Sequence, residues 1–231
     1  MTRILLIGHG RMGVLVEQLA PEYGCEVAGI VTEETGVAGI VAAPDSTEVA
    51  IDFTTANAVV GNIQALAERR INAVIGTTGW QAHESEVRAA VERHGIGVLA
   101  ASNFSIGLHI FRGAVAQAAA GFAAQEAVGA WIHEAHHIAK KDAPSGTALT
   151  LKESMVSAGY TRPIDVSSSR AGSIPGTHTV GFDAPSETIT LTHTVRDRAV
   201  FARGALEVAR WLVGKHGWFT IDDYLKSRAS L

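Results

Sequence analysis

The sequence predicts an α/β protein with a Rossmann-like, doubly wound parallel sheet and a second, smaller α+β domain that carries a mixed or antiparallel sheet. Over residues 3–101, short apolar runs alternate with helical apolar stripes, as in successive βα units. The first run opens into a glycine-rich turn at 8–13. Beyond residue 128 this alternation stops, and 187–195 alternates between apolar and polar residues, as an antiparallel strand does.

Composition bounds the class of protein. The chain has 231 residues, 47% of them apolar and 18% charged, with a mean hydropathy of +0.17, which is enough for a substantial core. A net charge of −4 and a pI near 6.2 give no indication of nucleic-acid binding. Cys25 is the only cysteine, so no internal disulfide can form. With no secretion signal or membrane-spanning run recognised, we expect a soluble, cytoplasmic protein.

The first βαβ unit carries a nucleotide-binding pattern. An apolar strand at 3–8 leads into Gly-His-Gly-Arg-Met-Gly at 8–13, followed by a helix over Val14–Ala20 and a second strand at 26–31. Glu33 stands 20 residues after the third glycine, where a ribose-binding acid is expected. This context favours a dinucleotide site, in which backbone N–H groups meet a pyrophosphate. The alternative is an ordinary glycine-rich turn with an exposed glutamate.

Further βα units follow. Strands are expected at 49–53, 71–76 and 97–101, with helices at 56–70 and 83–94. Each of these strands ends in small polar residues, at Asp52-Phe-Thr54, Gly76-Thr-Thr78 and Ser102-Asn-Phe104. Because ligands of open parallel sheets bind outside the carboxyl ends of the strands, we expect these tips to line a cofactor crevice. Taken singly, each tip is better explained by ordinary turn chemistry, and it is their shared position that favours a ligand site.

The middle of the chain predicts a strand, a polar loop and a helix. An alanine-rich helix at 106–122 is expected to connect the two domains. An apolar strand at 128–132 then feeds a polar cluster, and a helix begins near Gly146 and ends at Gly159.

The last third is more mixed. Residues 162–186 are rich in Ser, Gly and Pro and are expected to form a loop, or strands joined by loops. The strand at 187–195 should bury one face, with Thr and His on the polar face towards solvent, a cavity or another subunit. A strongly amphipathic helix is expected at 199–215, and 218–225 should pack back on the first domain.

The polar cluster, His133 to Leu149, is where we expect the chemistry. Lys140 and Lys141 are cations, and the N–H groups of Gly146 and Thr147 would stand unpaired at a helix N-terminus, which attracts anions. A histidine beside them can transfer a proton near neutral pH. The cluster therefore indicates an anionic substrate that gains a proton, and the competing interpretation is a solvated basic turn.

Two other functions stay open at this point. His133-Glu-Ala-His-His137 fits the H-E-x-x-H pattern of zinc hydrolases, which requires both histidines on one face of a helix. Here the pattern follows a strand-like run, and no third ligand is convincingly spaced, so metal binding is a minor alternative and we predict no metal. The other alternative is a non-catalytic module that senses a bound nucleotide.

Together these motifs resemble one family closely, the 4-hydroxy-tetrahydrodipicolinate reductases, also called dihydrodipicolinate reductases. The resemblance spans essentially the whole chain and is most specific in E-A-H-H-x-x-K-x-D-A-P-S-G-T-A at Glu134–Ala148. The other similar motifs are G-R-M-G at 10–13, D-F-T at 52–54, G-T-T-G at 76–79, S-N-F-S at 102–105, R-A-G at 170–172 and F-A-x-G-A at 201–205.

The resemblance implies an NAD(P)H-dependent reductase of the lysine and diaminopimelate pathway that acts on a small anionic dicarboxylate. It implies a dinucleotide-binding domain at 1–104 plus 202–231 and a substrate-binding and oligomerisation domain at 105–201, through which a homotetramer forms. By this match His136 is the proton donor or acceptor and Lys140 a second acid and substrate contact. The implied substrate-binding residues are His137, Gly146 and Thr147. The implied cofactor-binding residues are Gly8, His9, Gly10, Arg11, Met12, Gly13, Glu33, Gly76, Thr77, Thr78, Ala101, Ser102, Asn103 and Phe104.

Two departures from the family pattern bear on the cofactor. The glycine loop is one residue shorter than the commoner G-x-x-G-R-M-G, and Glu34 stands where many members have Arg. Residues 32–35 therefore lack a cation for a 2′-phosphate, although Arg11 could still reach one. We expect NADH or NADPH, with NADH favoured.

Overall fold

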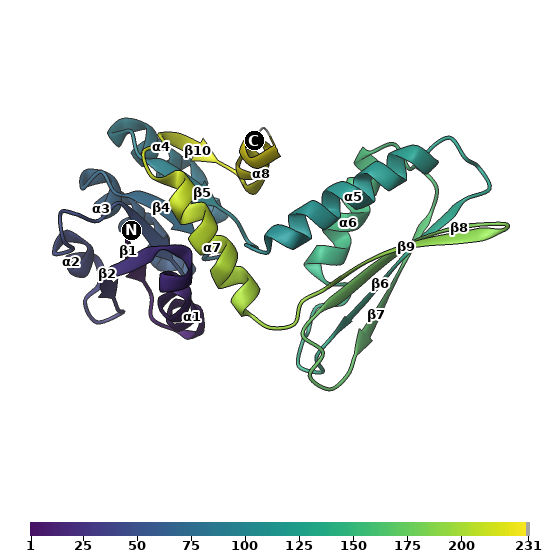
Figure 1. Ribbon diagram of the computed structural model, residues 1–231, viewed down its shortest axis with the longest axis horizontal. Helices are drawn as coiled ribbons and strands as arrows, with labels where there is room; N and C mark the ends of the chain where they lie inside the picture. Colours follow the sequence, from purple (N-terminus) through teal and green to yellow (C-terminus); the bar gives the residue numbers. More distant parts are fainter. Residues whose placement is uncertain (230–231) are drawn as a thin grey trace. The chain divides into compact units, whose positions relative to one another are not determined.

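The computed structural model describes residues 1–229. The chain forms two compact units, coloured by sequence in Figure 1. Unit 1 comprises Met1–Ser105 together with the described residues from Arg198 onwards, and unit 2 comprises Ile106–Asp197. The last part of the chain thus returns to the unit that the first part begins.

Unit 1 is built on a six-stranded sheet in the order β10-β5-β4-β3-β1-β2, in which every neighbouring pair is parallel. Its strands are β1 (Thr2–Ile7), β2 (Cys25–Val31), β3 (Val49–Asp52), β4 (Asn72–Ile75), β5 (Gly97–Ala100) and β10 (Gly217–Phe219). Because β1 lies between β2 and β3, the chain winds outwards from it in both directions. The carboxyl ends of β1 and β3 therefore form the switch point at which such sheets bind ligands.

Helices cover both faces of this sheet (Figure 1). They are α1 (Arg11–Leu19), α2 (Gly36–Val41), α3 (Ala56–Glu68), α4 (Glu84–His94), α7 (Ala199–Leu212) and α8 (Ile221–Ala229), with short 3₁₀ turns η1 (Ala20–Tyr23) and η2 (Gln81–His83). Leu5 and Ile7 of β1 pack in one buried cluster with α2, α3 and α4. Ile4 and Leu6 are equally buried on the opposite face, where α1 and α7 pack together. Burial on both faces explains why this strand is a continuous apolar run.

Unit 2 is a mixed four-stranded sheet covered on one face by two helices. The order is β7-β6-β8-β9; β6 and β7 are parallel, and β8 runs antiparallel to both β6 and β9. The elements are α5 (Ile106–Phe122), β6 (Gly129–His136), α6 (Gly146–Ser157), β7 (Ile164–Arg170), β8 (Thr177–Ala184) and β9 (Glu187–Thr194). Phe111, Ile132, Leu151 and Phe182 belong to the core between sheet and helices. The inner face of β6 carries Ile132, Glu134 and His136, because alternate residues of a strand share a face.

The predicted fold class is confirmed, with one local correction. Of the two alternatives for the Ser/Gly/Pro-rich stretch at 162–186, strands joined by loops is confirmed: it forms the regular strands β7 and β8, joined by a short loop. The predicted buried face of β9 is wrong for the single chain: Leu191 and His193 are half-buried, while Ile189 is 40% exposed. The reason is that β9 is an edge strand and α5 covers only part of it; Phe111 of α5 stacks on His193.

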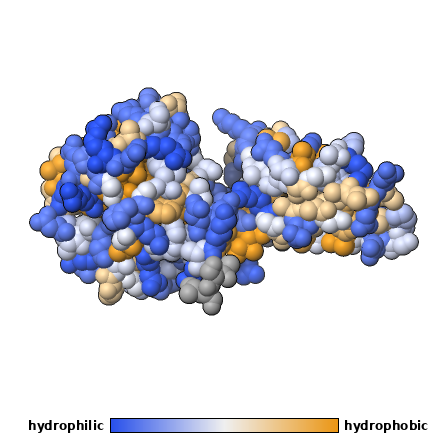
Figure 2. Space-filling view, turned by 90° about the horizontal axis from the view of Figure 1, so that it is seen from above, coloured by the Kyte–Doolittle hydropathy of each residue, from blue (hydrophilic) through white to orange (hydrophobic). Residues whose placement is uncertain are grey.

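Several large apolar side chains are exposed on unit 2. Figure 2 shows pale and orange patches over this unit, on the right of the view. Its exposed large apolar side chains are Ile110, Ile138, Leu149, Val156 and Ile189. Within residues 1–229, none of the helices is both long and apolar enough to cross a membrane.

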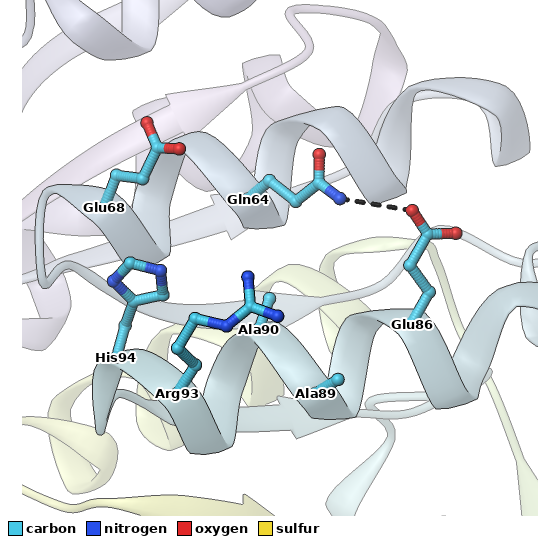
Figure 3. Close-up of a pocket in the computed structure, with 7 residues that line it drawn as sticks. All are labelled: Gln64, Glu68, Glu86, Ala89, Ala90, Arg93 and His94. Atoms are coloured by element: carbon cyan, nitrogen blue, oxygen red, sulfur yellow. Dashed lines mark hydrogen bonds between the residues drawn. The ribbon is translucent and has the colours of Figure 1, made fainter.

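A groove of about 430 Å³ lies between α3 and α4 of unit 1 (Figure 3). Gln64 donates a hydrogen bond across it to Glu86, at 3.1 Å. Its lining includes Glu68 and His94, at the last turns of the two helices. Because these helices run antiparallel to the strands, their last turns lie towards the amino edge of the sheet. The groove is therefore separate from the switch point at the carboxyl edge.

Candidate active site

The glycine loop of unit 1 is shaped for close contact with a ligand. Gly8 has φ +89°, and a Cβ there would collide with the carbonyl oxygen of Phe53. A Cβ at Gly13 would collide with the carbonyl oxygen of Gly8, so the loop folds tightly against α1 only with glycine at both positions. Gly10 is the N-cap of α1 and supplies no side-chain cap. The first-turn N–H groups of α1 are therefore available to a phosphate.

A pocket of about 210 Å³ lies at the carboxyl edge of the same sheet. Phe53 and Phe104 meet edge to face in its wall, with ring centroids 6.2 Å apart. A Cβ at Gly76 would collide with the Phe53 ring, so glycine is required at the tip of β4. The lining residues are Met12, Phe53, Gly76, Ser102, Asn103, Phe104 and Phe201. Five of the predicted cofactor residues thus share one pocket.

Thr77 and Ala101 lie instead in a neighbouring pocket of about 260 Å³, together with Ser102. The hydroxyl of Thr77 donates to the buried carboxylate of Asp52, at 2.8 Å, and accepts the Thr54 N–H, at 2.7 Å. Asn62 donates to the other oxygen of Asp52, at 2.9 Å. Asp52 therefore ties the tips of β3 and β4 together, and the side chain of Thr77 serves this network.

The remaining predicted cofactor residues are exposed. His9 pairs with Glu17 at 2.7 Å, and Arg11 is exposed on the first turn of α1. Glu33 is exposed two residues beyond the end of β2, and Thr78 is exposed beyond β4. Tight glycines, an open helix terminus, an acid after β2 and an aromatic-walled pocket together fit a pyridine dinucleotide.

In unit 2 a buried ionic network surrounds His136. Glu134 is 0% exposed and His136 is 9% exposed. His136 Nδ1 lies 2.5 Å from Glu134 Oε2. Arg170 of β7 donates hydrogen bonds to both carboxylate oxygens of Glu134, at 2.9 and 2.7 Å, and the Ser145 N–H donates to Oε1 at 3.1 Å. Arg170 also donates to the carbonyl oxygen of Asp142, at 2.5 Å, so one network joins β6, β7 and the polar loop.

These hydrogen bonds keep Glu134 ionised. Burial opposes ionisation, but hydrogen bonds from Arg170, Ser168, His136 and the Ser145 N–H outweigh it and lower the pKa of Glu134 to about 2. An ionised carboxylate only accepts hydrogen bonds, so the Nδ1 atom of His136 must carry a proton. The Nε2 atom is then the position at which His136 can gain or lose one.

A second buried histidine lies beside the first. His178 of β8 is 4% exposed, and its ring meets that of His136 edge to face, with centroids 5.1 Å apart. Its Nε2 atom lies 3.1 Å from the hydroxyl of Ser145, which also caps α6 by accepting the Ala148 N–H, at 3.2 Å. Burial, with the nearby charge of His136, lowers the pKa of His178 to about 4, so this imidazole is neutral at physiological pH.

The polar loop brings a lysine to the start of α6. Lys140 Nζ lies 2.8 Å from the carboxylate of Asp142, and this contact is the main reason why the pKa of Asp142 is lowered. The Gly146 N–H also donates to Asp142. The charge of Lys140 is close enough to act on His178. Lys140, Gly146 and His136 are therefore gathered in unit 2, as the layout of strand, loop and helix predicts. His137 and Thr147 are half-buried beside them, and Lys141 is exposed.

The zinc-hydrolase pattern does not have the geometry that its chemistry needs. His133 and Glu134 lie on β6 and not on a helix, so their side chains point to opposite faces of the sheet. His133 bonds Ser167 at 3.0 Å on the outer face, while Glu134 is buried on the inner one. No cluster of metal-ligating side chains occurs in the part of the chain that the structure describes.

Comparison with known proteins decides the family. Residues 2–104 match the model for dihydrodipicolinate reductase, N-terminus, and residues 107–225 match that for dihydrodipicolinate reductase, C-terminus. The chain belongs to the dihydrodipicolinate reductase family. The resemblance found from the motifs is thereby confirmed.

Individual relatives agree over nearly their full length. The chain is 36% identical to the 4-hydroxy-tetrahydrodipicolinate reductase of Methanoregula boonei, covering 97% of this chain and 98% of that one. It is 33% identical to the enzyme of the same name from Chromobacterium violaceum, with coverage of 97% and 98%. Among solved structures, a dipicolinate-bound dihydrodipicolinate reductase from Paenisporosarcina sp. TG-14 has the same fold, with a TM-score of 0.79 at 20% identity, over 95% of this chain and 97% of that one.

Sequence reasoning did not select several residues that this family member places at the centre of unit 2. The motifs predict no role for Arg170, Ser145 or His178, and they give Glu134 a role only in the zinc-hydrolase alternative. A signal for Glu134 was present: on a strand, residues two apart share a face, so Glu134 must lie beside His136. Arg170 and His178 carried no comparable local signal.

Proposed function

We propose that this chain reduces 4-hydroxy-tetrahydrodipicolinate to tetrahydrodipicolinate with NADH or NADPH, in diaminopimelate and lysine biosynthesis. The observation that carries this proposal is the grouping of His136, Lys140 and the N-terminus of α6 in unit 2 of a chain that matches reductases of this name over its whole length. The reaction removes water, formed from the hydroxyl group and a proton of the neighbouring ring carbon, and adds a hydride and a proton to the ring.

The polar loop is suited to a dicarboxylate. One substrate carboxylate would take the place that the Asp142 carboxylate now holds, between Lys140 Nζ and the Gly146 N–H. His137 and Thr147, at either end of the loop, would contact the substrate as well. The solved relative in complex with dipicolinate, a planar dicarboxylate, supports this class of ligand. Cations and helix-terminal N–H groups recognise such anions through charge-assisted hydrogen bonds.

His136 is the proton donor in this proposal. Its Nδ1–H is directed to Glu134, so the proton delivered to the substrate leaves from Nε2. Lys140 is the second acid and holds the substrate in place. A positioned acid of this kind accelerates a reaction by roughly 10²–10⁴-fold.

Unit 1 holds the cofactor, a pyridine nucleotide, which supplies the hydride when bound. Gly8 to Gly13 and the first turn of α1 would take the pyrophosphate, and the pocket around Phe104 would take the nicotinamide end. Glu33 would bond the adenosine ribose. The neighbouring Glu34 is exposed and would repel a 2′-phosphate, which favours NADH over NADPH.

The open face of the unit 2 sheet supports assembly into a homotetramer. Its outer face carries Trp131 and His133 of β6 and a ladder of threonines, in which Thr179 bonds Thr192 at 3.0 Å. None of these side chains is covered by a helix of the same unit, because α5 and α6 pack on the inner face. A second copy of the same sheet would bury this face and the exposed strand β9.

The test follows NADH and NADPH oxidation separately, with substrate generated freshly by the preceding synthase. We expect turnover with both nucleotides and a higher kcat/KM with NADH. His136→Gln should lower kcat by roughly 10²-fold or more without changing cofactor affinity. Lys140→Ala should raise KM and lower kcat together, whereas Lys152→Ala on the same unit should change neither. If the enzyme turns over with neither NADH nor NADPH, the proposal is overturned.

A further inference from the structure

Glu134 stands between the proton donor and the start of the substrate-binding helix. Its Oε2 atom meets His136 Nδ1 and Arg170, and its Oε1 atom meets Arg170 and the Ser145 N–H. Both oxygens are thus fully engaged by groups from three elements, β6, β7 and the N-cap of α6. Glu134 itself is 0% exposed, so its carboxylate is closed off from solvent, whereas His136 is 9% exposed.

This position fixes which nitrogen of His136 reacts. A neutral imidazole carries its proton on either Nδ1 or Nε2, and the group bonded to one nitrogen decides the state of the other. The carboxylate holds the proton on Nδ1, both before and after proton transfer. Every proton given to the substrate then leaves from Nε2, and every proton regained returns there.

The space around Nε2 agrees with this assignment. A Cβ at Gly176 would lie 3.2 Å from Nε2, and Gly176 has φ +140°. The loop after β7 thus passes beside the reactive nitrogen with no side chain over it. Nδ1, in contrast, is enclosed by Glu134 and has no access to a ligand.

Arg170 makes the buried carboxylate possible. A buried charge is costly unless it is paired and hydrogen-bonded, and Arg170 supplies two parallel hydrogen bonds and the opposite charge. Without it, Glu134 would tend to take up a proton and lose its ability to accept from His136. Arg170 also holds the carbonyl oxygen of Asp142, so it fixes the loop that carries Lys140.

We infer that Glu134 is a positioning residue that locks His136 in the tautomer with the proton on Nδ1, and that Arg170 is its obligatory counterion. The inference rests on the proposed function for its effect on turnover, but not for the tautomer itself. It adds to the reaction two residues that touch neither substrate nor cofactor. Their effect is exerted through His136 and through the N-cap residue Ser145.

The first measurement is the tautomer of His136 in the full-length protein labelled with ¹⁵N-histidine. Long-range ¹H–¹⁵N correlation spectra distinguish protonated from unprotonated ring nitrogens, and the spectrum of His136→Gln identifies the signals. We expect Nδ1 protonated in the wild type, and loss of that single state in Glu134→Gln, whose amide can donate to Nδ1 as well as accept. A wild-type Nε2–H tautomer would overturn the inference, whether or not the chain has the proposed activity.

The second measurement is steady-state kinetics. Glu134→Gln should lower kcat by roughly 100-fold, near the lower end of what a correctly positioned acid contributes, and leave the KM of the nucleotide unchanged. The matched control is Glu153→Gln, the same change at an exposed position on α6, which should retain full activity. A Glu134→Gln enzyme with a kcat close to that of the wild type would contradict the inference. Failure of the wild type to turn over would instead contradict the proposed function.

A second variant protects the test against unfolding. Glu134→Gln leaves the half-buried Arg170 without its counterion, whereas Glu134→Gln with Arg170→Met removes both charges, a change that proteins often tolerate. If Glu134→Gln alone does not fold, the double variant should fold and be as inactive as predicted for the single one. A folded double variant with normal kcat would overturn both assigned roles.

Discussion

Replacing His178 with Gln should remove much of the acid sensitivity of unit 2. His178 is 4% exposed, and its Nδ1 atom has no hydrogen-bond partner among the described residues. Protonation would therefore place a charge and an N–H group without an acceptor inside the core. Ser145, which faces Nε2, is committed to capping α6. The folded unit resists protonation at this site, and the unfolded chain does not.

The sign and size of the effect follow from the lowered pKa. Burial and the charge of His136 lower the pKa of His178 from 6.5 to about 4. Between these two pH values the unfolded chain binds a proton that the folded unit does not, so stability falls as the pH falls. At about 1.4 kcal/mol per pH unit, the loss is on the order of 3 kcal/mol between pH 6.5 and pH 4. That is a large share of a typical free energy of unfolding of about 5–15 kcal/mol.

The assay is urea unfolding at one protein concentration and at a series of pH values from about 7.5 to about 4. This range covers the window that the two pKa values of His178 define. A short deuterium pulse at fixed pH, read by mass spectrometry on peptides from β6 and β8, reports unit 2 alone. The wild type should lose stability steeply below pH 6.5, and His178→Gln should lose markedly less. His133→Gln, on the outer face of β6, is the control and should keep the wild-type slope. Equal slopes for His178→Gln and the wild type would refute the reasoning.

Three further predictions concern the reaction. Asp142→Asn should lower the KM of the substrate by up to about fivefold, since it releases an exposed ion pair that the substrate must otherwise displace; a raised KM would contradict this. Gly176→Val should lower kcat by at least about tenfold by crowding His136 Nε2, whereas Gly172→Val, also at positive φ but in open space, should affect kcat less; steady-state rates of the two decide. Glu34→Arg should shift the ratio of kcat/KM values towards NADPH by about tenfold or more, and an unchanged ratio would remove this residue from cofactor choice.

Those parts of the fold that depend on local patterns could be predicted from the sequence. The run before Gly8 is apolar throughout because both faces of β1 are covered, and that continuity identified a parallel strand. Ser145 caps α6 at the position where Pro144 and Gly146 predict the start of a helix. The glycines at 8 and 13 are required by close backbone contacts. Their spacing indicated the ligand because a strand precedes them, a helix and a second strand follow, and Glu33 stands at the expected interval.

The rest depends on pairings between distant segments. Arg170 meets Glu134 only because α6 carries the chain from β6 across to a parallel β7, which places residues 36 apart in sequence within hydrogen-bonding distance. His178 comes opposite Glu134 through the antiparallel pairing of β6 and β8. The Ser/Gly/Pro-rich composition around these strands left open whether the stretch forms loop or strand, because strand formation there is decided by neighbours and not by propensity. The exposure of β9 likewise depends on how far α5 reaches.

The local conformation of β6 decides which chemistry its histidines can perform. On a helix, His133 and His137 would share a face and Glu134 would stand beside them, which is the arrangement of a zinc hydrolase. On the strand, the period of two separates His133 from Glu134 and joins Glu134 to His136 instead. The same five residues thus yield a carboxylate–histidine pair suited to proton transfer. The apolar alternation of Ala130 and Ile132, buried under α5 and α6, sets this register, so the packing of the core selects the reaction.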